Sequence, residues 1–296
     1  MSKKSNEIEE ELNEFLEGKL PNKLYHYTNL NGLIGIIENS EIWLSNMYFL
    51  NDKNEFELGL RFVIEQLEAY KGGFSVLKPT KYFIEALEKA IDFIKEKDSP
   101  YILSMTTNND LLSQWRGYTN NGVGVNIGFS NNFFEENKLK VYKCIYEVEK
   151  QKEIVNHILT QSIFMFIGIA DSQGIFKDSE KIELSKYDNA VSIAGKYFID
   201  RTIFFCSLIK DKSFVEEDEW RLLLFDDKSE INFLNKGNYF KPYKKIKIDN
   251  LNDTINEVMM GPNSEKELCY LSLKMLFNKY NIELEKLQQS EIPYRN

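Results

Sequence analysis

The sequence predicts an α+β fold, in which a mixed or antiparallel β core carries helical insertions. Short segments rich in aromatic and β-branched residues recur between turn residues, which is typical of strands. Longer segments between them place apolar residues three or four positions apart, which is typical of amphipathic helices. No internal repeat or low-complexity linker divides the chain. We therefore expect a helical extension over residues 1–20 and a single α+β domain over 21–296, with a helical insertion at about 150–204.

The first part of that domain begins with two short strands around a helix. Residues 23–28 (KLYHYT) are rich in aromatic side chains and lie between Pro21 and Asn29, so they predict a strand. Residues 41–46 (EIWLSN) predict a second strand. Between them, residues 30–39 place leucine and isoleucine at helical spacing, which predicts a helix.

Helices are also expected on both sides of these strands. Residues 5–17 predict an acidic, exposed helix. The segments 55–70 and 80–97 predict two longer helices, and the second has a continuous apolar stripe. The glycine pair Gly72 and Gly73 separates these two helices.

The remainder of the chain alternates strands with helical or polar segments. Strands are expected at 101–106, 122–129, 140–147, 219–225, 243–249 and 255–261. A short helix or ordered loop is expected at 108–121. Ser264 and Glu267 form a capping-box pattern that predicts a helix to about Tyr280, and residues 281–290 predict a final strand or strand-like tail.

The net charge and the histidine count exclude several classes of function. The chain has 296 residues, with 37 Lys and Arg against 46 Asp and Glu, so its formal charge is −9. This sign argues against a protein that coats nucleic acid through a basic face, but it does not exclude an enzyme that binds nucleic acid through one local basic patch. The two histidines are His26 and His157, and the sequence has no H-E-x-x-H, no Cys/His zinc cluster and no G-x-S-x-G. We therefore expect no metal site built on histidine or cysteine, and only two candidates for imidazole chemistry.

Cysteine usage and the distribution of apolar residues predict a cytoplasmic protein. The three cysteines lie far apart and form no C-x-x-C motif, which fits a reducing compartment. The first 20 residues lack the apolar core of a signal peptide. The longest apolar run, 163–170, is much shorter than a membrane span, so no membrane segment is expected.

His26 is the first candidate site residue. In a strand it shares a face with Leu24 and Thr28, while Tyr25 and Tyr27 lie on the other face. One interpretation is a core histidine bonded to a backbone carbonyl. The other is that His26 lines the edge of a cleft, because aromatic residues flank it and a helix follows directly. A neutral imidazole there could form a hydrogen bond with a ribose hydroxyl.

The acidic run 216–219, which lies directly before a strongly apolar strand, is the second candidate. A solvated acidic turn is the usual structure of such a run. However, Glu219 stands at the start of the strand and shares a face with Arg221, and Glu217 lies on the same side if the backbone is extended. A carboxylate at a strand end could stabilise an oxocarbenium ion, and a second could orient or deprotonate a nucleophile. Arg221 could instead pair with either acid in a structural role.

A third candidate lies at 113–129. The glycines of GVGVNIG are spaced one residue too far apart for a dinucleotide-binding fingerprint, and no helix follows, so a Rossmann fold is excluded. They instead indicate a strand that approaches another backbone or a ligand closely. Trp115 and Tyr118 precede this strand, and they either stack on a flat ring or belong to the core.

Two further polar segments have structural explanations. In the segment 47–57, Asn51 or Asp52 is expected to cap a helix with Glu55 as its partner. The lysines of 241–247 are expected to be solvated residues of an edge strand.

Taken in order, several motifs resemble a known family. These motifs are LYHYT, WLSN with LND and a following Glu, ILSMT, W..Y....GVGVNIGF, K...F..E.EWRL, VMMGP and S.IPYR. The ordered set resembles bacterial proteins grouped as domain of unknown function 2971. The resemblance covers roughly residues 22–296, and 150–204 is its least similar part.

That family in turn resembles the ADP-ribosyltransferase-like superfamily of the His-Tyr-Glu type. The resemblance implies that His26 binds the nicotinamide ribose and that Glu219 completes the site. Glu217 then resembles the first acid of the E-x-E turn in arginine-modifying members. The tyrosine that packs against nicotinamide falls on either Tyr48 or Tyr118. A long helical insertion is atypical of the superfamily.

The implied function is NAD-dependent transfer of ADP-ribose to a protein or nucleic-acid acceptor, in a bacterial toxin or phage-defence effector. NAD is then a substrate, and the catalytic residues are Glu219, Glu217 and His26. The residues expected to contact NAD are His26, Tyr27, Thr28, Tyr48, Trp115, Tyr118 and Arg221.

Two alternative functions remain open at this point. The first is a non-enzymatic sensor or interaction module on a degenerate transferase fold, with the helical insertion as its partner surface. The second is a Mg²⁺-dependent nuclease that uses Asp52, Glu55 and the acids at 216–219.

Overall fold

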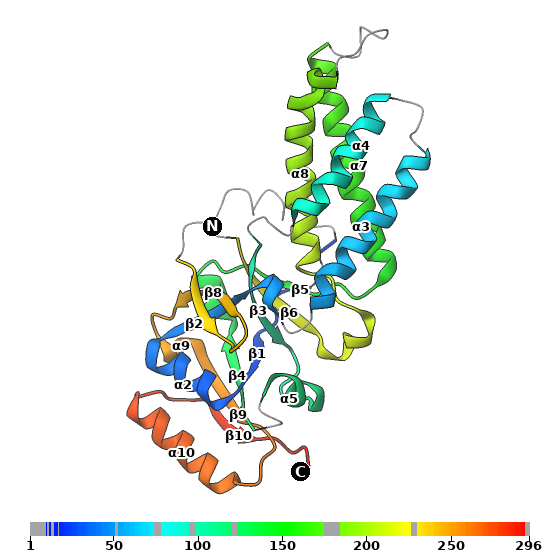
Figure 1. Cartoon of the computed structure of the whole chain (residues 1–296). Helices are drawn as coiled ribbons and strands as arrows, with labels where there is room; N and C mark the ends of the chain where they lie inside the picture. Colours follow the sequence, from blue (N-terminus) through cyan, green and yellow to red (C-terminus); the bar gives the residue numbers. More distant parts are fainter. Residues whose placement is uncertain are drawn as a thin grey trace.

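The computed structural model combines a mostly antiparallel β-sheet with a bundle of long helices at one end of it (Figure 1). It describes residues 10, 12, 15, 16, 18–50, 53–73, 78–94, 99–119, 123–174, 184–225 and 230–293. Nine ladders join the described strands, of which eight are antiparallel and one is parallel. The predicted α+β class with a mixed β core is therefore confirmed.

The described strands form a single sheet. They are β1 (Lys23–Thr28), β2 (Glu41–Asn46), β3 (Tyr101–Thr106), β4 (Val125–Ser130), β5 (Val141–Lys143), β6 (Glu219–Leu224), β7 (Asn232–Asn235), β8 (Phe240–Lys247), β9 (Ile255–Met260) and β10 (Lys286–Gln289). Their order is β10-β9-β4-β1-β3-β2-β8-β7, and β6 joins β3 to β5. The bounds of β1, β2 and β3 agree with prediction, whereas β7 was not predicted.

The sheet splits at β3. Strand β6 pairs with β3 along its whole length, from Tyr101 to Thr106. At its other edge, β3 meets β1 through Thr106 and meets β2 through Tyr101 and Ile102. Among the described ladders, residues 103–105 therefore pair with β6 alone, and β1 and β2 diverge from this point. The divergence leaves room for a cavity between the two strands.

The described helices are, in chain order, α2 (Leu30–Asn39), α3 (Lys53–Gly73), α4 (Lys78–Ile94), α5 (Leu112–Tyr118), α6 (Asn131–Glu136), α7 (Val148–Ser172), α8 (Asp188–Cys206), α9 (Leu251–Thr254) and α10 (Lys266–Lys279). Helix α2 begins as the sequence suggests, because the Asn29 side chain accepts a hydrogen bond from the Gly32 amide. Helix α10 does not begin as expected. Its N-cap is Glu265, which makes no side-chain capping bond, so the predicted capping box of Ser264 and Glu267 is absent.

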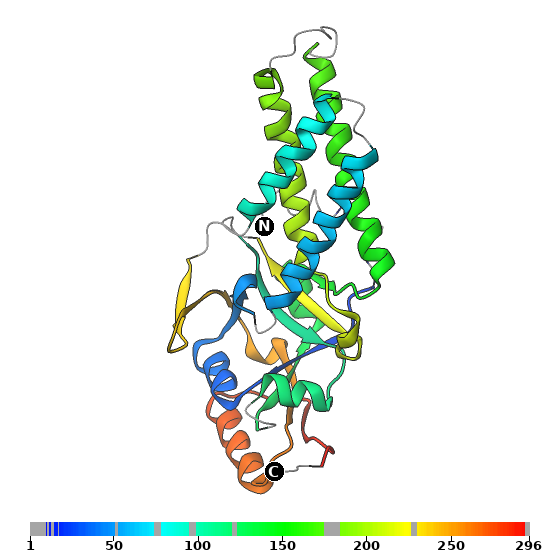
Figure 2. The same ribbon diagram turned by 45° about the vertical axis from the view of Figure 1, so that its right-hand side comes forward.

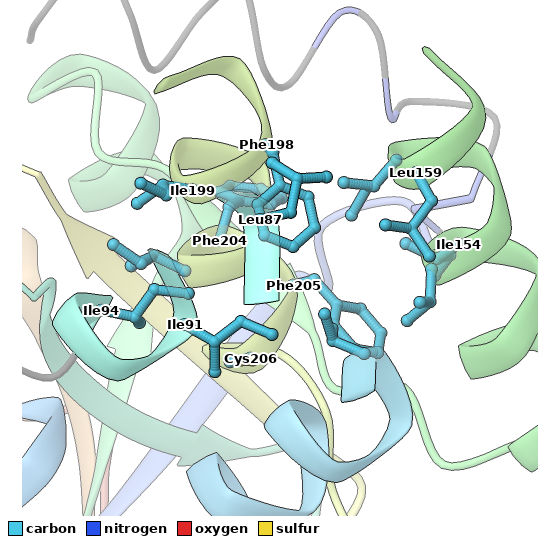
Figure 3. Close-up of a cluster of buried hydrophobic side chains, with 14 of the residues drawn as sticks. Leu87, Ile91, Ile94, Ile154, Leu159, Phe198, Ile199, Phe204, Phe205 and Cys206 are labelled. Atoms are coloured by element: carbon cyan, nitrogen blue, oxygen red, sulfur yellow. The ribbon is translucent and has the colours of Figure 1, made fainter. Parts of the chain in front are cut away.

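Helices α3, α4, α7 and α8 pack together as a bundle beside the sheet (Figures 1 and 2). The predicted insertion at 150–204 corresponds to α7 and α8, but these helices share one core with α3 and α4. The bundle is therefore formed by two separate segments of the chain, one with α3 and α4 and the other with α7 and α8. Its core contains Leu87, Phe198 and Phe205 (Figure 3), and Phe83 stacks on Phe166 with ring centroids 4.5 Å apart.

Close approach of α3 to α8 depends on Gly59. A β-carbon at this position would lie 2.7 Å from Cys206 Sγ and 3.2 Å from the Cys206 backbone, so a larger residue would push the helices apart. The predicted N-terminal helix 5–17 lies mostly outside the described residues. Leu12, however, is only 2% exposed and packs in the bundle core, which corrects the expectation of a wholly exposed segment.

Helix α7 has the length and apolar composition of a membrane span, which the search for apolar runs in the sequence did not find. By this measure, it is the one such helix in the described part of the chain. One face of α7, which includes Ile158, Leu159 and Phe166, is buried in the bundle. A core helix has the same length and composition, so these two properties do not distinguish between a core helix and a membrane span.

A second apolar core lies against the sheet, where α2, α6 and α10 cover one face. Side chains alternate along the strands, so Leu103 and Leu222 enter this core, whereas Ile102 and Leu223 face the bundle. The face that carries Ile102 and Leu223 also carries the candidate site residues.

Candidate functional site

A cavity of about 300 Å³ lies where β1 and β2 diverge. Residues of β3 line it, together with the first turns of α2, the strand β2 and the start of β6. The lining includes His26, Thr28, Gly35, Trp43, Ser104, Tyr118, Lys210, Glu219, Arg221 and Lys241. A volume of this size is at the lower end of the range for small-molecule sites. The split in the sheet therefore produces a cavity large enough for part of a nucleotide.

His26 occupies the gap between the diverging strands. Its Nδ1 lies 2.9 Å from the carbonyl oxygen of Ser104, and a carbonyl can only accept, so Nδ1 carries the proton. Burial lowers the pKa of His26, and the bond to Ser104 opposes this effect only in part. His26 is therefore neutral at pH 7, with Nε2 as a hydrogen-bond acceptor. Both interpretations of its sequence position hold, because it bonds a backbone carbonyl and also lines the cavity.

Five buried charged side chains form what we call the charge cluster. Glu55, Lys210, Glu219 and Arg221 line one end of the cavity, and Glu217 lines a small adjoining cavity instead. Each is at most 7% exposed. The Lys210 ammonium donates to Glu217 Oε2 at 2.6 Å, contacts Glu219 Oε2, and lies 3.3 Å from Glu55 Oε1. Arg221 Nε donates to Glu219 Oε1 at 2.7 Å, and its Nη2 donates to Glu55.

The pKa values of Glu217 and Glu219 are shifted in opposite directions. Burial raises the pKa of Glu219, but the adjacent Arg221 and Lys210 outweigh burial and bring the pKa to about 2. Burial dominates at Glu217, whose pKa is raised even though Lys210 opposes the change. Glu219 is consequently an anion near pH 7, whereas Glu217 more readily accepts a proton.

The acidic run folds as a turn that buries alternate residues. Asp218 adopts a left-handed conformation with φ of 39° and forms an ion pair with Lys143 at 2.8 Å. Thr106 Oγ1 donates to the Glu217 carbonyl, and the Glu219 amide donates to the Tyr146 hydroxyl at 2.8 Å. The run is thus held against β3 instead of forming the solvated acidic turn that is usual for such sequences.

The predicted aromatic residues divide between the cavity and the core. Tyr118 lines the cavity and is 37% exposed. Trp115 is fully buried, and its Nε1 donates to Asp110 at 2.7 Å, so it belongs to the core. The Tyr48 hydroxyl donates to the Ile94 carbonyl, and its ring packs edge-on against Phe56, away from the cavity lining.

Other predicted contacts lie at or near the cavity. Thr28 and Arg221 line it. Tyr27 lines a small adjoining cavity with Glu217, and its hydroxyl holds the loop before α5 by donating to the Asn108 carbonyl at 2.9 Å. Gly124 approaches Thr28 closely, since a β-carbon there would lie 2.5 Å from the Thr28 carbonyl oxygen. Gly124 lies directly before β4, within the predicted strand 122–129, so the prediction that a glycine of this segment permits close backbone contact is confirmed.

Sequence reasoning missed Lys210 and assigned Glu55 a different role. Glu55 was expected to assist a helix cap, but its carboxylate instead binds Arg221 and Lys210. Its expected partners at 51 and 52 lie outside the described residues. A lysine at the end of the apolar segment FFCSLIK, nine residues before Glu219, is the signal that could have indicated a buried ion pair.

The charge cluster leaves little opportunity for a metal ion. No group of three or more His, Cys, Asp and Glu side chains within the described ranges has the arrangement of a metal site. The three clustered carboxylates are instead bound by an ammonium and a guanidinium group. The nuclease hypothesis also required Asp52, which lies outside the described residues.

Residues 114–222 match the model of a family described as "Protein of unknown function (DUF2971)". The match supports the resemblance to that family. The matched segment runs from α5 to β6, so it contains Tyr118, Lys210, Glu219 and Arg221 but not His26 or Glu55. It is narrower than the resemblance at 22–296, and it includes 150–204. No curated protein and no solved structure matches the chain.

Proposed function

We propose that this chain is an NAD-dependent ADP-ribosyltransferase whose active site is the cavity at the sheet split. One observation carries the proposal. His26, Tyr118 and Glu219 come from distant parts of the chain and line the same cavity. They supply a ribose hydrogen-bonding group, an aromatic ring and an anionic carboxylate, which are the groups that cleavage of a nicotinamide riboside requires.

The reaction breaks the bond between ribose C1′ and the nicotinamide nitrogen. The electron pair of this bond leaves with nicotinamide, and positive charge develops on the ribose as an oxocarbenium-like state. Glu219 supplies a fixed negative charge and is itself only 3% exposed, and electrostatic stabilisation by a buried group is stronger than in water. The acceptor nucleophile then bonds to C1′ and releases a proton.

Three further residues would support this step. Glu217 has a raised pKa and is the candidate base for the proton that the acceptor releases. The neutral His26, with Nε2 as an acceptor, can hold a ribose hydroxyl because its Nδ1–H is already fixed by the Ser104 carbonyl. Tyr118, which is half-exposed at the cavity, is the ring against which nicotinamide would stack.

Nicotinamide release from NAD is the direct test. We expect the wild-type chain to release nicotinamide and the Glu219→Gln variant to lose this activity while still binding NAD. Because Glu219 lies in the charge cluster, thermal unfolding must be recorded for the variant. His26→Asn provides a second variant outside that cluster, and its nicotinamide release should also fall. A wild-type chain that neither binds NAD nor releases nicotinamide would contradict the proposal.

Ligand binding without turnover is a second candidate function. It is favoured by the internal pairing of the cluster, since both oxygens of Glu219 already accept bonds from Lys210 and Arg221. This function predicts saturable NAD binding without nicotinamide release. It also predicts that Glu219→Gln changes the unfolding free energy but has no turnover to abolish.

A further inference from the structure

Helix α10 lies at the edge of the molecule far from the bundle (Figures 1 and 2). Its inner face includes Leu273 and Phe277, which are buried in the core beneath the sheet. Its outer face carries Leu268, Leu271 and Met275, which are 64%, 56% and 65% exposed. The helix therefore has apolar side chains on two opposite faces.

The three outer residues form a regular stripe. They are spaced i, i+3 and i+7, so they follow one line along the helix at 3.6 residues per turn. A surface helix usually has one apolar stripe, which faces its own core. A second, contiguous exposed stripe is typical of a surface that packs against another protein.

Charged residues on both sides of the stripe are arranged by sign along the helix. Glu267 and Lys274 lie on one flank. On the other flank, Lys279 is the last residue of α10, and Glu265 is the N-cap residue directly before the first turn. On each flank the acid is near the start of α10 and the lysine is near its end. Lys279 also lies 4.0 Å from Glu38.

We propose that this stripe pairs with the same stripe of a second copy, so that the two α10 helices pack antiparallel about a two-fold axis near Leu271. In an antiparallel pair, like flanks meet. With the axis between residues 271 and 272, Glu267 of one copy is offset from Lys274 of the partner by two residues, or roughly 3 Å along the helix. Glu265 meets Lys279 of the partner by the same symmetry.

The charges select the second copy and its direction. A parallel arrangement would bring opposite flanks together, so that the two glutamates meet each other and the two lysines meet each other. The antiparallel arrangement instead forms four ion pairs, each between a glutamate of one copy and a lysine of the other. They surround three apolar residues from each copy. The occupant of the stripe is therefore the same helix of another chain.

Sedimentation velocity and light scattering of the full chain, over a micromolar concentration series, test this proposal. We expect a dimer for the wild type. Leu271→Glu should weaken the dimer by about tenfold or more, because it places a charge at the centre of the interface. Met275→Glu should act in the same direction. The control is Phe164→Glu on α7, where an equally exposed apolar residue lies outside the stripe, and it should leave the dimer intact.

Charge reversal tests the antiparallel direction. Glu267→Lys and Lys274→Glu should each weaken the dimer, and the double variant should restore it. Strengthening of the dimer by Glu267→Lys alone would overturn the antiparallel arrangement. A wild-type chain that remains monomeric throughout the series, even if it binds some other protein, would overturn the proposal.

Discussion

The charge cluster and the rim of the same cavity differ in how their residues are bound. The rim consists of Gly35, Trp43 and Tyr118. In the cluster, buried carboxylates are bound by Lys210 and Arg221 at fixed distances. At the rim, Tyr118 and Trp43 are 37% and 38% exposed, and Gly35 borders open space. The cluster is therefore bound up with the stability of the fold, whereas the rim is free to contact a ligand.

The charge cluster also joins the helix bundle to the sheet. Glu55 lies in the first turn of α3, and Arg221 lies in β6 and also donates to the Ser207 carbonyl at the end of α8 at 2.8 Å. The cluster thus bridges the two halves of the molecule. Because a buried charge without its partner is costly, substitutions there should act first through folding.

Arg221→Met should have the largest effect on stability. It leaves Glu55 and Glu219 without the guanidinium group, and we expect the unfolding free energy to fall by about 3–5 kcal/mol. Urea denaturation measures this change. Lys143→Met is the matched control: it removes a partly exposed partner of Asp218, and its cost should be at most about 1 kcal/mol. Equal losses for the two variants would contradict the distinction between buried cluster and surface pair.

Gly35→Leu should block the cavity without weakening the fold. A β-carbon at Gly35 has no neighbouring atom within 4 Å, and leucine favours a helix over glycine by about 1 kcal/mol. We expect loss of NAD binding by calorimetry together with an unchanged or higher melting temperature. Gly168→Leu on α7 also enters open space and should leave binding intact. Retained NAD affinity in Gly35→Leu would place the ligand elsewhere.

Tyr118→Ala should reduce ligand affinity more than stability. Stacking of a base on an aromatic side chain contributes about 1–3 kcal/mol, so NAD affinity should fall at least about fivefold. Tyr239→Ala, at an exposed ring outside the cavity lining, should not change the affinity. If both variants bind NAD as the wild type does, Tyr118 is not a ligand contact.

His26 lies between the charge cluster and the rim, and its substitution should have the smallest effect on the unfolding free energy. Its pKa is lowered in the folded state, so as the pH falls below about 6.5 the unfolded chain binds a proton that the folded chain does not. Stability should consequently decrease from pH 7 to pH 5. Urea denaturation at both pH values should show a smaller decrease for His26→Asn. His157→Asn is the control. If the unfolding free energy of His26→Asn decreases between pH 7 and pH 5 by as much as that of the wild type, His26 does not cause this pH dependence.

Local patterns predicted the parts of the site that lie on one strand. Alternation along residues 219–225 placed Glu219, Arg221 and Leu223 on one face, and the structure confirms it, since Arg221 bonds Glu219 and Leu223 enters the bundle core. The bounds of β1, β2 and β3 were likewise predicted. These features depend only on the two-residue period of a strand and on neighbouring turn residues.

The contacts that complete the site depend on tertiary structure. Arg221 and Glu55 are 166 positions apart, and His26 and Ser104 are 78 apart, so no local period relates them. The same is true of the bundle, in which one helical hairpin packs against another from a distant segment. The sequence by itself determined which faces of its strands are polar and which residue types could perform carboxylate chemistry. Only the tertiary structure decided which of these residues share a cavity and which charges neutralise one another, because long-range packing sets both.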